Sequence, residues 1–206
     1  VAQRMMGFTD GQRPPSAAAY QALVAPEAPA GSGPRGGQPY PFFLAQPLAD
    51  GPEALGERSG WWAEWKYDGI RAQVVKRESQ VWIWSRGEEL VSERFPEVLA
   101  AARHWPDGTV VDGELLAWRA GEADPAPFAL LQKRIGRTRL GPAILAEAPV
   151  RLLAYDLLED AGQDLRDQPL HARRARLVAL GIPASPLLAA DDWAGLAALR
   201  AQARAH

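Results

Sequence analysis

The sequence predicts an α+β domain of mostly antiparallel sheets flanked by helices. One observation is a run of short β-type segments with tight connections, which is typical of an antiparallel meander. The other is that amphipathic helix-type segments separate the later strands instead of alternating strictly with them, as they would in a parallel sheet. With 206 residues, 47% hydrophobic and 23% charged, the chain has the composition of a soluble globular protein. We therefore expect one sizeable core.

The first 41 residues are expected to lie outside that core. Residues 1–25 are predicted to form two short helices, the second beginning after Pro14, Pro15 and Ser16. Residues 26–41 are rich in Pro, Gly, Ala and Ser, which is typical of a linker. All eight tryptophans fall between Trp61 and Trp193. The main domain is therefore predicted at residues 42–206.

Within the main domain, apolar patterning and the positions of Pro, Gly and Asp predict the elements in order. Strands are expected at 61–67, 70–76, 81–84, 109–118 and 151–158, and helices at 96–104, 127–135 and 170–180. A final helix, capped by Asp191 or Asp192, is expected to run to the end of the chain. Gly69 is predicted to allow a tight reversal between the first two strands.

Charge and composition limit the function classes. The formal net charge is −2, so contact with nucleic acid would have to come from local basic surfaces. The chain has no cysteine, which excludes disulfides and thiolate metal sites. No signal-type apolar run opens the sequence, and no window approaches the ~18 apolar residues of a membrane span. We expect a cytoplasmic protein, and a fragment, because the chain begins on Val1 and stops at His206 in a helix-type segment.

The main motif is Lys66, Asp68, Gly69 and Arg71 in the pattern K-x-D-G-x-R, preceded by Glu64. A lysine can act as a nucleophile toward phosphorus only as the neutral amine. Because its unperturbed pKa is about 10.4, very little of it is neutral near neutral pH unless that pKa is lowered. Partial burial and the positive charge of Arg71 or of a metal would lower that pKa. On an extended strand Glu64 and Lys66 share one face. A carboxylate next to the amine would instead raise the pKa of Lys66, so we expect Asp68 to point at metal or substrate.

Three further segments follow in order. Residues 84–87 (Trp-Ser-Arg-Gly) contain Arg86, which by itself fits a hairpin turn. In 110–118, Asp112 and Glu114 are two positions apart and therefore face the same side of the sheet. If this strand is central, the two carboxylates would hold Mg²⁺. If it is an edge strand, they would lie in solvent. In 151–158, Tyr155 is either a core residue or an aromatic platform.

Taken together and in this order, the four segments resemble the covalent nucleotidyltransferases, which comprise ATP-dependent DNA ligases, RNA ligases and mRNA capping enzymes. Residues 1–7, 40–45 and 127–137 also resemble the bacterial ATP-dependent DNA ligases that have an N-terminal helical DNA-binding domain. The resemblance implies that residues 1–25 end that helical domain and that 42–206 begin the adenylation domain. The family motifs E-G-x-x-x-K and K-x-K and the OB-fold domain are not found. We therefore expect the isolated chain to be inactive or very weak.

The resemblance implies a role for each residue. Lys66 would be the nucleophile that forms a lysine-AMP intermediate. Glu64 and Tyr155 would hold adenine, Arg71 and Glu114 the ribose end, and Arg86 the phosphate of the nick. Most relatives have Phe where this chain has Tyr155. ATP and Mg²⁺ or Mn²⁺ would be the cofactors of a monomeric, nucleoid-associated bacterial enzyme. Nicked double-stranded DNA would be its partner in repair, replication and recombination.

Two alternatives remain open at this point. An RNA ligase or a capping-type nucleotidyltransferase would use the same Lys66 chemistry, and a catalytically silent DNA-binding module would not use it. The basic residues outside the motifs are expected to be solvated, although the first group would also suit phosphate contacts. These residues are Lys133, Arg134, Arg137 and Arg139 near one helix end, and Arg173, Arg174 and Arg176 on a later helix.

Overall fold

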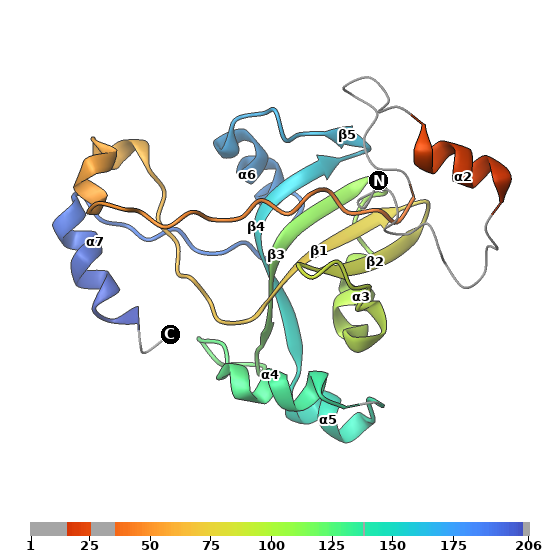
Figure 1. Ribbon diagram of the computed structural model, residues 1–206. Helices are drawn as coiled ribbons and strands as arrows, with labels where there is room; N and C mark the ends of the chain where they lie inside the picture. The colour runs from red at the N-terminus through yellow and green to blue at the C-terminus, as the bar shows by residue number, and fades with distance from the viewer. Residues whose placement is uncertain (1–15, 26–35, 138, 204–206) are drawn as a thin grey trace.

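A computed structural model of the chain describes residues 16–25, 36–137 and 139–203. Its centre is one five-stranded sheet with the order β2-β1-β3-β4-β5, in which every neighbouring pair is antiparallel (Figure 1). The strands are β1 (Ile70–Arg77), β2 (Gln80–Ser85), β3 (Thr109–Ala117), β4 (Val150–Asp160) and β5 (Gln163–Asp164). The predicted α+β class with an antiparallel sheet is confirmed.

The β1 to β2 hairpin and the buried β3 set the register of the sheet. Glu78 and Ser79 join β1 to β2 with φ values of 49° and 61°, as a two-residue turn with left-handed backbone requires. β3 is the central strand, and all nine of its residues are buried. Asp112 and Glu114 therefore lie in the interior of the sheet and not on a solvated edge.

Helices cover one face of the sheet, as Figure 1 shows for α3, α4 and α6. The bounds of these three helices are α3 (Pro96–Ala102), α4 (Phe128–Ile135) and α6 (Leu170–Ala179), and a short helix α5 (Pro142–Glu147) follows α4. The main core lies on this face, where Val98, Leu131 and Leu177 pack against Val74 and Leu115. The helices predicted at 96–104, 127–135 and 170–180 are confirmed to within two residues, whereas α5 was not predicted.

The opposite face carries a polar row between two small apolar clusters. One cluster consists of Tyr40, Val75, Trp84, Val110 and Leu158, and the other of Tyr67, Leu116 and Leu153. Arg71, Asp112 and Glu114 lie between them, because residues two apart on a strand share a face. This polar row is where the candidate site forms.

The segment before β1 differs from the prediction. Residues 61–67 do not form a strand, and their one ladder contact is an isolated bridge between Glu64 and Leu187. Gly69 makes no hairpin there. A Cβ at this position would lie 2.5 Å from the carbonyl oxygen of Leu115, so glycine is required for the segment to pass close over β3. Sequence patterning cannot distinguish this close approach from a turn.

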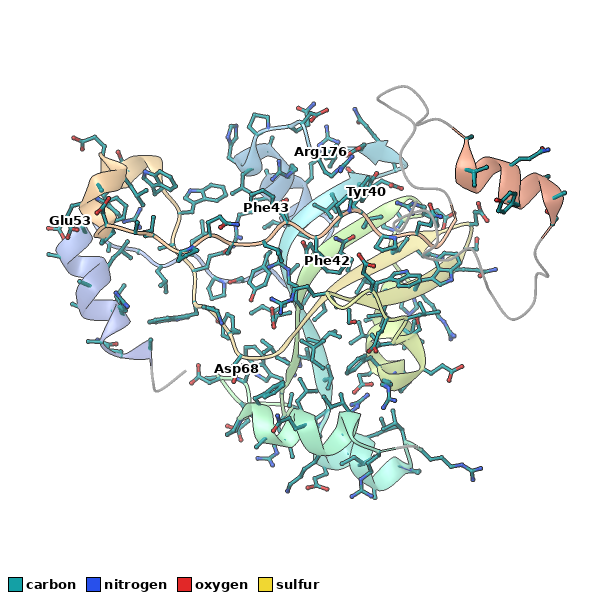
Figure 2. All side chains as sticks on the ribbon, viewed as in Figure 1. Tyr40, Phe42, Phe43, Glu53, Asp68 and Arg176 are labelled. Atoms are coloured by element: carbon teal, nitrogen blue, oxygen red, sulfur yellow. The ribbon has the colours of Figure 1, made fainter. Side chains whose placement is uncertain are left out.

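The N-terminal part contains α2 (Ala17–Val24), which confirms the predicted helix after Ser16. The helix predicted at residues 1–6 and most of the predicted linker lie outside the described residues. Further along, the segment Gly36–Tyr40 packs on the sheet, where the Tyr40 ring is buried and Trp84 Nε1 donates to the Gly37 oxygen over 2.6 Å. Figure 2 shows Tyr40 over the sheet.

The C-terminal part places α7 (Trp193–Arg200) beside the 3₁₀ turns at Pro52–Leu55 and Arg58–Gly60 (Figure 1). Asp192 caps this helix by accepting a hydrogen bond from the Gly195 N–H over 2.7 Å, as predicted. The helix ends at Arg200 and does not run to the end of the chain. In the described parts of the chain, no helix combines the length and apolar character needed to cross a bilayer.

Candidate active site

An open pocket of about 310 Å³ lies where β1 begins and β2 ends, and Glu114 of β3 forms part of its wall. Its lining brings together the residues predicted from two separate motifs and part of a third. The lining residues are Lys66, Tyr67, Asp68, Gly69, Ile70, Arg71, Ser85, Arg86, Gly87 and Glu114. Most of this lining is polar, which suits a charged ligand.

Lys66 stands in the extended segment that leads into β1, and its side chain is exposed. The partial burial of Lys66 that was predicted from the sequence is not found among the described residues. Asp68 is also exposed in the pocket, and Figure 2 shows it in the loop before β1. The close approach at Gly69 holds this segment against β3, where a Cβ on Gly69 would lie 2.7 Å from Cγ of Glu114. Lys66 is thereby placed within electrostatic range of the Glu114 carboxylate.

Arg71 is fixed by a bidentate ion pair with Asp112 on the neighbouring strand. Nε donates to Oδ1 over 2.6 Å and Nη2 to Oδ2 over 2.9 Å, so both carboxylate oxygens are engaged. Burial raises the pKa of Asp112, and the bond to Arg71 opposes that rise. The described residues give Nη1 of Arg71 no hydrogen-bond acceptor. A planar guanidinium held in this way is suited to a substrate oxygen.

Glu114 faces Arg71 directly across the β1 to β3 ladder. Burial raises the pKa of its carboxyl, while Arg71, the Tyr155 hydroxyl and Lys66 act in the opposite direction. The Tyr155 hydroxyl approaches Glu114 Oε2 at 3.4 Å, which is a long contact for two oxygens. Glu114 thus keeps acceptor capacity toward the pocket.

Tyr155 occupies an irregular position in β4. The register passes from Asp112 opposite Asp156 to Gly113 opposite Ala154, so Tyr155 is an extra residue without its own partner. Bulges of this kind redirect a side chain and are common near active sites. The Arg71 guanidinium lies 5.2 Å from the centre of the Tyr155 ring. Burial and the nearby Glu114 raise the pKa of the Tyr155 hydroxyl, which therefore stays neutral.

Arg86 is exposed in the turn after β2, and its backbone N–H donates to the Arg71 oxygen over 3.0 Å. That hydrogen bond attaches the turn to β1 and brings Arg86 to the same pocket as Lys66. The turn itself is closed by hydrogen bonds between Ser85 and the backbone of Glu88 and Glu89. The structure thus brings four residues to one pocket: Lys66 from the segment before β1, Arg71 from the start of β1, Arg86 from the turn after β2 and Glu114 from within β3.

Comparison with known proteins agrees with this arrangement. Residues 42–187 match the family described as ATP dependent DNA ligase domain. The chain belongs to this family. A probable DNA ligase of Koribacter versatilis is 38% identical over 161 residues, which are 78% of this chain and 28% of that protein. A probable DNA ligase of Opitutus terrae is 44% identical over 142 residues, 68% of this chain and 14% of that protein.

A solved structure of similar fold is a mycobacterial DNA ligase D complexed with ATP and MES. It matches with a TM-score of 0.56 and 27% identity, covering 71% of this chain and 46% of that one. The ligase domain of Mycobacterium tuberculosis LigD gives the same TM-score with 26% identity. The matched part of this chain therefore spans 46% of these solved chains and only 28% and 14% of the two curated relatives.

In this ligase-family chain, the pocket offers few ligands for a metal ion. The described residues hold no group of three or more His, Cys, Asp or Glu side chains that would enclose one. Asp112, considered above as a ligand, instead gives both oxygens to Arg71. Asp68 and Glu114 remain as pocket carboxylates. One or two carboxylates are what Mg²⁺ uses when substrate phosphate and water complete its shell, so the donor set fits that mode of binding.

The structure contradicts the prediction that Arg134, Arg173 and Arg174 are solvated. Arg134 is fully buried. It makes an ion pair with Glu97 and also donates to the carbonyl oxygens of Arg94 and Ala148. Arg173 pairs with Asp156 through two bonds of 2.8 Å. Arg174 pairs with Glu64, and of the three arginines of this helix only Arg176 is exposed. No local pattern distinguishes these arginines, since their carboxylate partners are 17 to 110 residues away.

Proposed function

We propose that the whole protein containing this chain is an ATP-dependent DNA ligase and that Lys66 is its covalent nucleophile. The observation that carries the proposal is the gathering of Lys66, Arg71, Arg86 and Glu114 around one open polar pocket. The order of the motifs and the membership of the ligase domain family support it further. An exposed amine beside two guanidinium groups is a suitable arrangement for attack on a polyphosphate.

In the first step, the neutral amine of Lys66 attacks the α-phosphorus of ATP. A nitrogen–phosphorus bond forms, the bond to the β-phosphate oxygen breaks, and pyrophosphate leaves. The amine proton passes to solvent at the open side of the pocket. The AMP group then moves to the 5′-phosphate of a nick, and the 3′-hydroxyl displaces AMP to join the strands.

The remaining residues position the substrate. Tyr155 presents its ring to the base, since an aromatic face stacks on any purine. Glu64 accepts a hydrogen bond from the base, and Arg71 and Glu114 hold the ribose end. Phosphoryl transfer depends chiefly on positioning and charge stabilisation, which is the role that Arg71 serves once Asp112 has fixed its plane.

A divalent ion and nicked DNA complete the proposal. Mg²⁺, held by Asp68 or Glu114 with phosphate and water, would neutralise charge on the transferring phosphate. Arg86 is exposed and lines the pocket, which supports a contact with the 5′-phosphate of a nick. We infer a monomer acting on duplex DNA in the bacterial cytoplasm, with residues 1–25 ending a DNA-binding domain and residues 42–206 belonging to the adenylation domain.

The test is to incubate the whole protein with α-labelled ATP and Mg²⁺ and to locate the adduct by mass spectrometry. We expect AMP on Lys66, the loss of labelling in Lys66→Ala, and normal labelling in Lys133→Ala, because Lys133 is exposed, pairs with Glu147 and does not line the pocket. Labelling with GTP instead would indicate a cap-forming enzyme. Sealing of nicked RNA but not nicked DNA would indicate an RNA ligase. An adduct on another residue would overturn the assignment.

A further inference from the structure

Arg174 is the one arginine of α6 that reaches the segment carrying Lys66. Its Nη1 donates to Glu64 Oε1 over 2.8 Å, and its Nη2 donates to the carbonyl oxygen of Ser185. The guanidinium also lies 5.8 Å from the centre of the Trp62 ring. With side-chain exposures of 12% for Arg174 and 27% for Glu64, this is a partly buried pair and not a surface contact.

The other two arginines of α6 serve different purposes. Arg173 uses its donors on Asp156 and on the carbonyl oxygens of Arg166 and Gln168. Arg176 approaches Asp160 at 3.5 Å near the surface. Arg174 therefore has a specific target, and that target stands two positions before Lys66.

Glu64 needs such a partner to remain an acceptor. Burial raises the pKa of its carboxyl, and Arg174 is the strongest influence in the opposite direction. Asp156 of β4 adds to the rise, and the buried Ser185 hydroxyl opposes it. Ser185 Oγ has no well-formed hydrogen bond in the described chain. The ion pair occupies Oε1 of Glu64 and orients the carboxylate, whose second oxygen remains for a donor.

The segment 184–187 connects Glu64 to the neighbourhood of Tyr155, because Ala184 bridges to Ala154 of β4 and Leu187 bridges to Glu64. The charge of Glu64 accordingly contributes to raising the pKa of the Tyr155 hydroxyl. A carboxylate beside a ring that stacks on a base recognises a hydrogen-bond donor at the base edge. Adenine presents an amino group at position 6, whereas guanine presents a carbonyl oxygen there, which a carboxylate repels.

We propose that Arg174 is a positioning residue that holds Glu64 as an acceptor and so makes the site selective for a purine with a 6-amino group. This inference rests on the proposed function, because it assigns the base end of the same site. Arg174 does not contact the reacting atoms. Its loss should therefore weaken discrimination among nucleotides more than it weakens transfer itself.

The experiment compares formation of the Lys66 adduct from ATP with that from purine riboside triphosphate, which lacks the 6-amino group, and from inosine triphosphate, which has oxygen there. The variants are Arg174→Met, Arg174→Lys and Glu64→Gln, and Arg176→Met on the same helix is the matched control. In Arg174→Met we expect the preference for ATP over purine riboside triphosphate to fall about tenfold or more, as expected for a lost charge-assisted hydrogen bond.

Further expectations separate positioning from a structural role. Arg174→Lys should keep part of the preference, Arg176→Met should keep all of it, and Arg174→Met with Glu64→Gln should be no less selective than Glu64→Gln alone. Equal losses with all three nucleotides, or an unchanged preference in both Arg174 variants, would overturn the inference while the function stands. A wild-type protein that forms no Lys66 adduct with any nucleotide would overturn both.

Discussion

The two ends of the sheet contain the same three groups, an arginine of β1, a carboxylate of another strand and a tyrosine ring, but in different surroundings. At one end Arg77 pairs with Glu159 beside Tyr40, and at the other Arg71 pairs with Asp112 beside Tyr155. Arg77 has a side-chain exposure of 9%, whereas Arg71 has 29%. The end with Arg77 is therefore closed to solvent, and the end with Arg71 is open to it.

The segment Gly36–Tyr40 makes this difference. The carbonyl oxygens of Gly36 and Gln38 accept from Nη1 of Arg77, and the Tyr40 hydroxyl donates to Glu159 over 2.8 Å. Every nitrogen of the Arg77 guanidinium is thereby bonded. No corresponding segment of the described chain covers Arg71. When backbone covers such a cluster, its hydrogen-bonding groups are paired within the protein and stabilise the fold. When the cluster is left open, it keeps donors for a ligand.

The largest expected effect is on stability at the closed end. Arg77→Met leaves the Glu159 carboxylate buried without its cation, which should cost about 3–5 kcal/mol of unfolding free energy. Urea unfolding of the chain would measure it, with Arg176→Met as a control whose near-surface pair should be worth at most about 1 kcal/mol. A stability loss no larger than that of the control would remove the distinction between the two ends.

At the open end, Gly69→Ala should reduce function more than stability. The new Cβ would meet the Leu115 carbonyl oxygen at 2.5 Å, and this backbone atom cannot move aside cheaply. The Lys66 segment must shift instead, and a displacement of that kind costs about 100-fold in rate. The rate of Lys66 adduct formation would show it. Gly60→Ala, where a Cβ would meet no atom within 4 Å, should be silent.

The pair of Arg134 with Glu97 is an intermediate case, because the arginine is fully buried and the Glu97 side chain is 32% exposed. Burial raises the pKa of Glu97, but the bonds from Arg134 and the Val150 N–H outweigh it and lower the pKa overall. The stabilisation is therefore complete above the unfolded-state pKa of about 4.3 and is lost as pH falls through the folded value.

Glu97→Gln should thus cost about 1.5–3 kcal/mol at neutral pH, the range for hydrogen bonds to charged groups. Urea unfolding of both proteins at neutral pH and at about pH 3 would test this, since protonation of the wild-type carboxyl should bring the two curves together. A difference in unfolding free energy that stays constant with pH would show that packing, and not charge, holds α3 to β4.

The smallest effect concerns Tyr155. Tyr155→Ala should weaken ATP use by about 1–3 kcal/mol through the lost stacking surface. Tyr155→Phe should be nearly unchanged, because the 3.4 Å contact with Glu114 is too long to contribute much. Adduct formation rates at several ATP concentrations would separate the two variants. A large loss in Tyr155→Phe would show that the hydroxyl of the open end acts as the Tyr40 hydroxyl does at the closed end.

The sequence by itself determined the local elements and the composition of the site. Alternation and apolar runs predicted β1, β2, β3 and β4, and the Pro, Gly and Asp signals predicted α3, α4, α6 and the cap at Asp192, because these patterns act within a few residues. Nucleotidyl transfer was indicated by resemblance, because the K-x-D-G-x-R motif at Lys66 and the order of the three segments after it resemble the covalent nucleotidyltransferases.

Only the tertiary structure decided what each charged residue contacts. The bulge that redirects Tyr155, the close approach at Gly69 and the partners of Arg134 and Arg174 depend on segments far apart in the chain. An arginine has the same local signal whether it is solvated or buried. Its state is set by whether a distant carboxylate or carbonyl oxygen arrives to replace water, and that follows from strand register and helix packing.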